Sequence, residues 1–125
     1  MTRKIDEAEP DGSANLVRLR GKVSTAPEER ELPSGTSIVT LRLSVPRETS
    51  PMTEGSRQTA DWVDCAAWGR KVRRTVSGWR AGDLVEVEGA LRRRFYRGGA
   101  GTATRLEVEV LSGRVLARAE VRKAG

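Results

Sequence analysis

The feature that most constrains the fold of this chain is a two-residue alternation of apolar and polar side chains. It recurs in residues 15–23, 38–45, 59–69, 83–97 and 102–122. This period is typical of strands that bury one face and expose the other. With 125 residues, the chain has room for one domain of this kind. The sequence therefore predicts one mainly β domain built around a single core.

One segment breaks the alternation. Val72, Val76 and Trp79 recur at helical spacing, which predicts a short helix between the third and fourth strands. Gly21 and Gly89 lie inside strands, at points where the strands of a small barrel have to bend. Three strands, one short helix and then further strands is the order of an OB-fold. We therefore expect an all-β fold with one short helix, namely a five-stranded OB-fold barrel.

The chain divides into a leader, a domain body and polar connections. Residues 1–14 are polar and are predicted to be a disordered leader, followed by an OB-fold domain over residues 15–111. Residues 24–37 contain two prolines and are predicted to be a connection, and residues 46–58 to be a polar loop with a functional or flexible role. The sequence contains neither a secretory signal nor an apolar run long enough to span a bilayer, so we expect a cytoplasmic protein without membrane contact.

The charge of the chain favours a polyanionic partner. The 23 Lys and Arg exceed the 17 Asp and Glu, which gives a net charge of +6. Residues 1–14 hold two bases and four acids, a net charge of −2, so the rest of the chain carries +8. Nineteen of the basic residues are Arg, whose planar guanidinium suits phosphates and stacks on flat rings. A basic body of this size is typical of nucleic-acid-binding proteins.

The composition argues against an enzyme. The chain has no His and a single cysteine, Cys65, which excludes Ser-His-Asp and Cys-His catalysis, an intrachain disulfide and a multi-cysteine zinc site. Cys65 is predicted to be a small buried side chain. Glu86 and Glu88 share one strand face, Glu107 and Glu109 another, and both pairs are predicted to be solvated. We expect no catalysis, no metal and no cofactor.

The few aromatic side chains are the candidates for ligand contact. Trp62 and Trp68 are six residues apart on one strand, so both are predicted to lie on the face opposite the core. Exposed tryptophans at this spacing are covered either by a stacked nucleotide base or by a subunit interface, and the residues alone leave both open. Trp79 is predicted to close one end of the barrel.

A second group of aromatics lies in an arginine-rich hairpin arm. Phe95 and Tyr96 are adjacent and therefore point to opposite sides, so one is predicted to be structural and the other available for stacking. Three arginines, residues 92–94, precede them, and Arg97 follows them. A glycine-rich hairpin tip comes directly after Arg97. Arginines interleaved with an aromatic side chain provide a track for phosphates and a platform for bases. The alternative is a solvated arm in which arginine serves solubility.

Several blocks, taken in order, resemble the bacterial single-stranded-DNA-binding protein family. The resemblance covers residues 15–110 and is carried by NLVRLRG, APE, LPSG, DWV, AWGR and AGDLVEVEGAL. It implies a homotetramer around which single strands wrap with aromatic stacking. Trp62, Trp68 and Tyr96 match stacking positions of the family. Arg70 and Arg80 match positions near its DNA path, as does Arg92 at the start of the arm.

The candidate nucleic-acid-binding residues are therefore three aromatics and six arginines. They are Trp62, Trp68, Tyr96, Arg42, Arg70, Arg80, Arg92, Arg94 and Arg97.

The chain departs from the family at two places. Residues 46–49 contain no aromatic, although the family has a stacking residue after the second strand. Residues 118–125 are short and basic, whereas the family carries a long tail with an acidic tip, so we expect a tail-less or tail-trimmed member. Residues 111–121 resemble an extra C-terminal strand of actinobacterial members. Residues 112–125 are therefore expected to form a strand or short tail at a subunit interface.

The leading functional hypothesis is sequence-independent binding and protection of single-stranded DNA, without catalysis. The resemblance implies a role in replication, recombination or repair at the nucleoid, as a homotetramer or alternatively a homodimer. RNA remains a possible ligand on the sequence alone. The alternative hypothesis is a primosomal-type OB-fold adaptor that acts in replication restart through protein contacts, with Trp62 and Trp68 buried between subunits.

Overall fold

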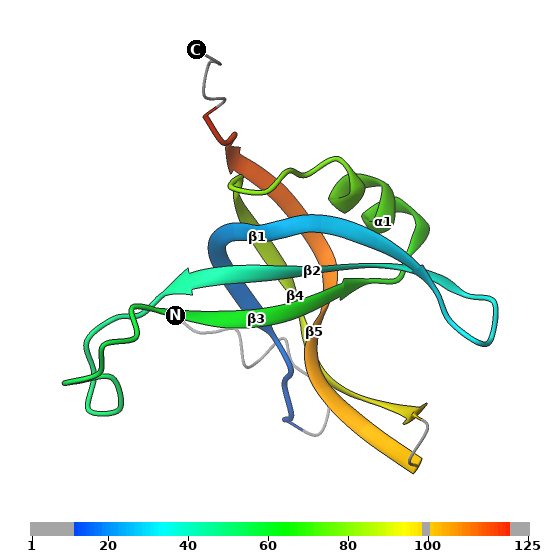
Figure 1. Ribbon diagram of the computed structural model, residues 1–125, viewed down its shortest axis with the longest axis horizontal. Coiled ribbons are helices and arrows are strands. Elements are labelled where there is room, and N and C mark those ends of the chain that lie inside the picture. The colour runs from blue at the N-terminus through cyan, green and yellow to red at the C-terminus, as the bar shows by residue number, and fades with distance from the viewer. Residues whose placement is uncertain (1–11, 99–100, 121–125) are drawn as a thin grey trace.

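Five strands and one helix form a closed barrel in a computed structural model that describes residues 12–98 and 101–120 (Figure 1). In chain order they are β1 (Val17–Glu31), β2 (Ser37–Pro46), β3 (Ala60–Ala67), α1 (Arg70–Ser77), β4 (Leu84–Gly98) and β5 (Gly101–Ala117). Around the barrel the order is β1-β2-β3-β5-β4. Neighbouring strands are antiparallel except β3 and β5, which are parallel. The predicted five-stranded OB-fold with a helix after the third strand is confirmed.

Both strand glycines lie where the barrel bends. Residues 17–22 of β1 pair with β4, and from Lys22 onward β1 pairs with β2, so the strand changes partner beside Gly21. A Cβ on Gly21 would lie 2.5 Å from the Ser44 carbonyl oxygen. At Gly89 the β4–β5 register shifts, leaving Leu111 without a partner on β4. Both glycines thus lie at points where the strand pairing changes, as expected for the positions where strands of a small barrel bend.

The core fills the barrel with the apolar face of each strand. It consists of Val23, Val39, Leu41, Leu43, Cys65, Ala67, Val76, Trp79, Val85, Val87, Val108 and Val110. Trp79 follows α1, is buried as predicted, and lies so close to Gly113 of β5 that a Cβ there would meet the indole at 2.7 Å. Leu106 alternates with Val108 and Val110 on β5 but is exposed, and it lies opposite Arg93 in the β4–β5 ladder. The end of this hairpin extends away from the barrel (Figure 1).

A buried carboxylate fixes the chain at the helix end of the barrel. Asp83, fully buried just before β4, accepts hydrogen bonds from the backbone N–H groups of Arg80 and Ala119. Its Oδ2 also accepts from Arg118 at 2.8 Å. These contacts tie the residues after β5 to the turn that follows α1.

Two boundaries differ from the sequence prediction. Residues 24–31 were predicted to be a connection but continue β1, so the connection to β2 is only residues 32–36. Residues 112–117 were expected to form an additional strand but are the end of β5 and pair with β4. The predicted leader up to residue 11 and the C-terminal residues 121–125 lie outside the described residues.

The prediction that Glu86 and Glu107 are solvated is wrong. Both side chains are buried, although their strand faces point away from the core. Glu86 accepts hydrogen bonds from Arg20 on β1 and Arg114 on β5, and Glu107 accepts one from Arg94. The hydrogen bond from Arg20 is the main reason why the pKa of Glu86 lies below its usual value. Long arginine side chains from neighbouring strands cover these carboxylates and exclude water from them.

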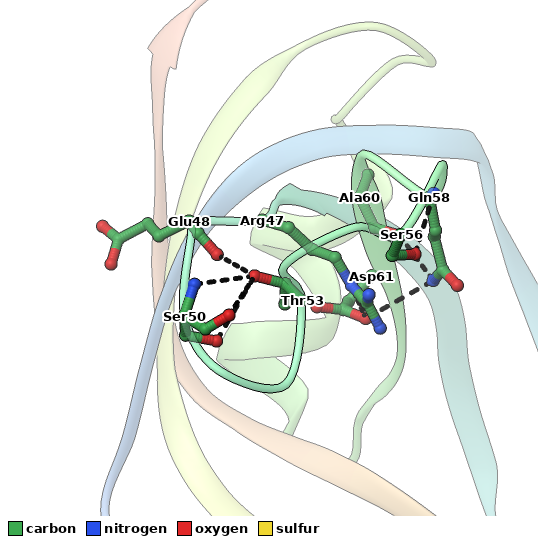
Figure 2. A network of polar contacts seen from close by, with 8 residues as sticks. All are labelled: Arg47, Glu48, Ser50, Thr53, Ser56, Gln58, Ala60 and Asp61. Carbon is green, nitrogen blue, oxygen red and sulfur yellow. Dashed lines mark hydrogen bonds and ion pairs between the residues drawn. The ribbon is translucent and has the colours of Figure 1, made fainter.

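The polar loop between β2 and β3 is held by its own contacts (Figure 2). The Arg47 backbone N–H donates to the Thr59 carbonyl, and its guanidinium Nε donates to Asp61 Oδ1 at 2.9 Å. Thr53 Oγ1 donates to the Glu48 carbonyl at 2.6 Å. The loop therefore extends the β2–β3 ladder as a structured turn, with Arg47 directed toward Asp61.

Candidate nucleic-acid interface

The first candidate stacking side chain, Trp62, stands on the outer face of the β2–β3 ladder. Its partner across the ladder is Ser44, and the next pair on the same face is Arg42 with Asp64. Trp62 is 71% exposed. The Arg42 guanidinium carbon lies over its ring, 5.1 Å from the centroid, while Arg42 Nε donates to Asp64 Oδ1 at 2.9 Å.

The other candidate aromatics meet in an open groove of about 650 Å³. The groove lies between the β1–β2 connection and the β4–β5 hairpin, two segments far apart in sequence. Its aromatic lining consists of Trp68, Phe95 and Tyr96. Its cationic lining consists of Arg30, Arg94 and Arg105. Flat rings and guanidinium groups in one open groove suit a ligand with flat bases and anionic phosphates.

A second hollow, of about 380 Å³, adjoins this groove, and Arg42 in its lining reaches over the ring of Trp62. It shares Arg30, Thr40 and Arg105 with the groove, and Arg42 and Asp64 also line it. The candidate interface is therefore one continuous surface that runs from Trp62, past Arg42, to Trp68 and Tyr96.

Three of the six predicted arginines have a carboxylate partner among the described residues. Besides Arg42, Arg92 pairs with Glu109 at 3.0 Å and Arg94 pairs with buried Glu107. In each pair the arginine and its acid lie on neighbouring strands: Arg42–Asp64, Arg92–Glu109 and Arg94–Glu107. They hold the guanidinium groups in fixed places and offset part of their charge.

Other cations have no carboxylate partner among the described residues. Arg70 and Arg80, at the two ends of the α1 segment, are exposed and lack an ion pair there. Arg105 lacks one as well, and its guanidinium carbon lies 5.8 Å from the centroid of the Tyr96 ring. The side chain of Arg97 lies outside the described part of the chain. The cations without partners are the ones whose full charge is available to a polyanion.

Sequence reasoning missed three residues of the surface. Phe95 and Tyr96 are both exposed and both line the groove, so the prediction that one of them is structural is wrong. Arg30 was missed because residues 24–37 were interpreted as a connection, and Arg105 because its strand position only indicated an outward direction. The cross-strand pairing of Arg105 with Arg94 is what brings it beside the aromatics.

The thiol of Cys65 and the acidic side chains of the described residues form neither a reactive nucleophile nor a metal site. Cys65 is buried as predicted, and burial, together with the nearby charges of Asp64 and Glu107, raises the pKa of its thiol to about 12. A thiol held in its neutral form is a poor nucleophile. Within residues 12–98 and 101–120, no three acidic or cysteine side chains gather as a metal site. No helix in that part of the chain has the length and apolar character needed to cross a bilayer.

Comparison with known proteins identifies relatives of this barrel. The profile of the Single-strand binding protein family matches residues 14–117. Single-stranded DNA-binding protein A of Bacillus subtilis is 33% identical over 87 residues, which are 70% of this chain and 49% of that protein. Single-stranded DNA-binding protein 3 of Listeria innocua is 32% identical over 88 residues, or 70% of this chain and 53% of the relative. Single-stranded DNA-binding protein 1 of Staphylococcus aureus is 34% identical over 87 residues, 70% and 51% of the two chains. The chain thus spans about half the length of the curated relatives it matches.

Proposed function

The chain belongs to the single-strand binding protein family, and from this we propose that it binds single-stranded DNA without sequence preference and without catalysis. Bases stack on Trp62, Trp68 and Tyr96, and arginines along the same surface neutralise the phosphates. Stacking on aromatic rings accepts every base, because each base has a flat face. The names of the relatives and the +6 charge of the chain support this proposal.

The observation that carries the proposal is the groove shared by aromatic and cationic side chains. Trp68, Phe95 and Tyr96 come from two separate regions of the chain and line one open groove with three arginines. Such exposure of large aromatic rings is unfavourable in water unless a ligand or partner covers them. A strand laid in the groove would cover the rings with its bases and bring its phosphates to the guanidinium groups.

Titration with oligo(dT) tests this function. Binding should quench the tryptophan fluorescence, because bases stack on Trp62 and Trp68. The logarithm of the affinity should fall linearly with the logarithm of the salt concentration, with a slope of about −0.7 per phosphate contact. Unchanged fluorescence and no complex at low salt with excess oligonucleotide would contradict the proposed function. An RNA oligonucleotide of equal length, used as competitor, measures the preference between the two nucleic acids.

The Trp62→Ala variant separates DNA binding from the adaptor alternative. In the proposed function it weakens oligo(dT) binding by about 1–3 kcal/mol, the contribution of one stacked base, and leaves the oligomer intact. In a primosomal-type adaptor, with Trp62 buried between subunits, the same change dissociates the oligomer. Native mass spectrometry of both proteins, with and without oligo(dT), measures assembly and binding together.

We also propose a homotetramer, with a homodimer as the alternative. Residues 17–21 of β1 pair with β4 on one side and, within the described residues, have no strand partner on the other. An open edge of this kind is a template for pairing with another chain. The exposed leucines Leu16, Leu91, Leu106 and Leu111 provide apolar surface that a second copy would cover. The C-terminal residues from 112 onward are proposed to contribute to the same contacts.

The cellular role that fits this activity is the protection of single-stranded DNA at the nucleoid. Replication, recombination and repair all expose such strands, and sequence-independent binding suits each of them. The role follows from the proposed ligand rather than from any single residue.

A further inference from the structure

The ring of Trp62 already carries a planar cation. The Arg42 guanidinium carbon lies over the indole at 5.1 Å from its centroid, and Arg42 Nε donates to Asp64 Oδ1 at 2.9 Å. Arg42 and Asp64 are direct partners in the β2–β3 ladder, so the backbone register fixes this ion pair. Asp64 therefore positions Arg42 on the ring.

A base that stacks on Trp62 competes with Arg42. Guanidinium groups and bases both use the face of an aromatic ring. Arg42 lies opposite Asp64, and Asp64 is two residues closer to Trp68 along the chain than Trp62 is. Arg42 therefore reaches the Trp62 ring from the side on which Trp68 lies. A strand that stacks on Trp62 and continues into the groove has to pass this guanidinium.

The nucleotide has the stronger interaction. The Arg42–Asp64 pair is partly exposed, with 45% and 34% of the two side chains accessible, and exposed ion pairs and cation–π contacts are individually weaker than base stacking. The displaced guanidinium is then free to bind the adjacent phosphate, for which its planar fork is well suited. Arg42 thus exchanges a carboxylate of its own chain for a phosphate of the ligand.

We propose that the Arg42–Asp64 pair is a latch over the Trp62 stacking surface, and that Asp64 lowers the affinity of this position by holding Arg42 there. The inference rests on the proposed binding of single-stranded DNA and adds a positioning residue to it. Asp64 acts through Arg42 and does not need to touch the strand.

The latch has a consequence for the salt dependence of binding. When a phosphate replaces Asp64 on Arg42, the freed carboxylate recruits a cation from solution. The exchange releases no net counterion, so this phosphate contact does not contribute to the salt dependence. Without the carboxylate, Arg42 meets the phosphate directly and one more counterion is released.

The Asp64→Asn variant tests the latch. We expect it to bind labelled oligo(dT) about twofold to fivefold more tightly at about 0.1 M salt, as loss of a partly exposed ion pair implies. The slope of log affinity against log salt should become steeper by about 0.7. The matched control is Asp61→Asn, which makes the same charge change on the same strand. Asp61 pairs with Arg47, whose side chain is only 14% exposed and is turned to the β2–β3 loop.

A double-mutant cycle distinguishes the latch from simple repulsion between Asp64 and DNA. If Asp64 acts through Arg42, its replacement gives no gain in affinity in the Arg42→Gln background. Equal gains from Asp64→Asn and Asp61→Asn, or a gain that persists with Arg42→Gln, overturn the latch. Wild-type protein is titrated first: absence of oligo(dT) binding there overturns the proposed function itself, whereas normal wild-type binding with equal variants overturns the latch alone. Unchanged circular dichroism and Tm verify that each variant is folded.

Discussion

Arg70 and Arg92 both lie close to Trp68, but they differ in the charge around them. Arg70 follows Trp68 by two residues and has no carboxylate partner in the part of the chain that is described. Arg92 lines a hollow beside Trp68 and is paired with Glu109. An arginine with no carboxylate partner attracts a phosphate with its full charge. An arginine in an ion pair must first break its contact with the carboxylate. Arg70 should therefore contribute more to the salt dependence of binding than its paired neighbour.

Replacing Arg70 by Gln should lower the steepness of the salt dependence by about 0.7, the contribution of one phosphate contact to a single strand. The matched control is Arg18→Gln, because Arg18 is also exposed but is paired with Glu88 on the β1–β4 face. Oligo(dT) titrations at four or five salt concentrations measure both slopes. A slope for Arg70→Gln equal to that of Arg18→Gln would show that Arg70 does not contact a phosphate.

At the residue scale, the sequence predicted what depends on position within one element. The two-residue period placed Cys65 inside, and the helical period placed Trp79 in the core, because each follows from the neighbours along the chain. The same two-residue period predicted solvated side chains for Glu86 and Glu107, but arginines from other strands bury both of them. Contacts of that kind depend on which strands become neighbours in the barrel, and no local pattern contains this information.

At the scale of elements, β1 shows where local rules mislead. Pro27 and Pro33 predicted a connection over residues 24–37, yet β1 continues to Glu31. The β1–β2 register is irregular between Thr25 and Glu28, which is where Pro27 lies. A proline in such an irregular stretch removes no regular ladder hydrogen bond, so it does not end the strand. Because this part of β1 was not predicted as a strand, Arg30 was not predicted to line the groove.

The bend of β4 depends on Gly89. A Cβ at this position would lie 1.8 Å from the Glu109 carbonyl oxygen, so Gly89→Ala forces the β4–β5 backbones apart. We expect this variant to lose about 3 kcal/mol of unfolding free energy, the upper part of the range for overpacking, because backbone atoms cannot rotate away. Urea unfolding measures the loss.

Gly78→Ala is the control for this prediction. A Cβ on Gly78 would be 3.6 Å from the nearest atom, an ordinary contact, and the residue has a negative φ of −86°. Its unfolding free energy should stay within about 0.5 kcal/mol of the wild type. Equal stabilities of the two variants would contradict the close approach at Gly89.

At the scale of the whole molecule, buried carboxylates couple folding to pH. The N–H of Ala119, with smaller contributions from Arg80 and Arg118, lowers the pKa of Asp83, and Arg20 and Arg114 lower that of Glu86. A carboxyl whose pKa is lower in the folded than in the unfolded state stabilises the fold fully above its unfolded pKa. The contribution is lost as the pH falls through the folded pKa.

The Tm should therefore stay level from neutral pH to slightly above the ordinary carboxyl pKa of about 4, and decrease below it. Asp83→Asn should have a lower Tm at pH 7 and a shallower decrease in acid, because it has already lost the ionised group. Thermal unfolding followed by circular dichroism between pH 7 and about pH 2.5 measures both curves. Parallel curves for the two proteins would mean that Asp83 does not contribute to the acid sensitivity.

The three tryptophans occupy three environments, and this gives the molecule an internal spectroscopic standard. Trp79 is buried against Gly113, Trp68 is half-buried at the groove, and Trp62 is exposed. Indole emission shifts to longer wavelength as its surroundings become more polar. The short-wavelength side of the spectrum therefore reports the integrity of the barrel, and the long-wavelength side reports events at its surface. One recorded spectrum can thus distinguish a protein that has bound a ligand from one that has begun to unfold.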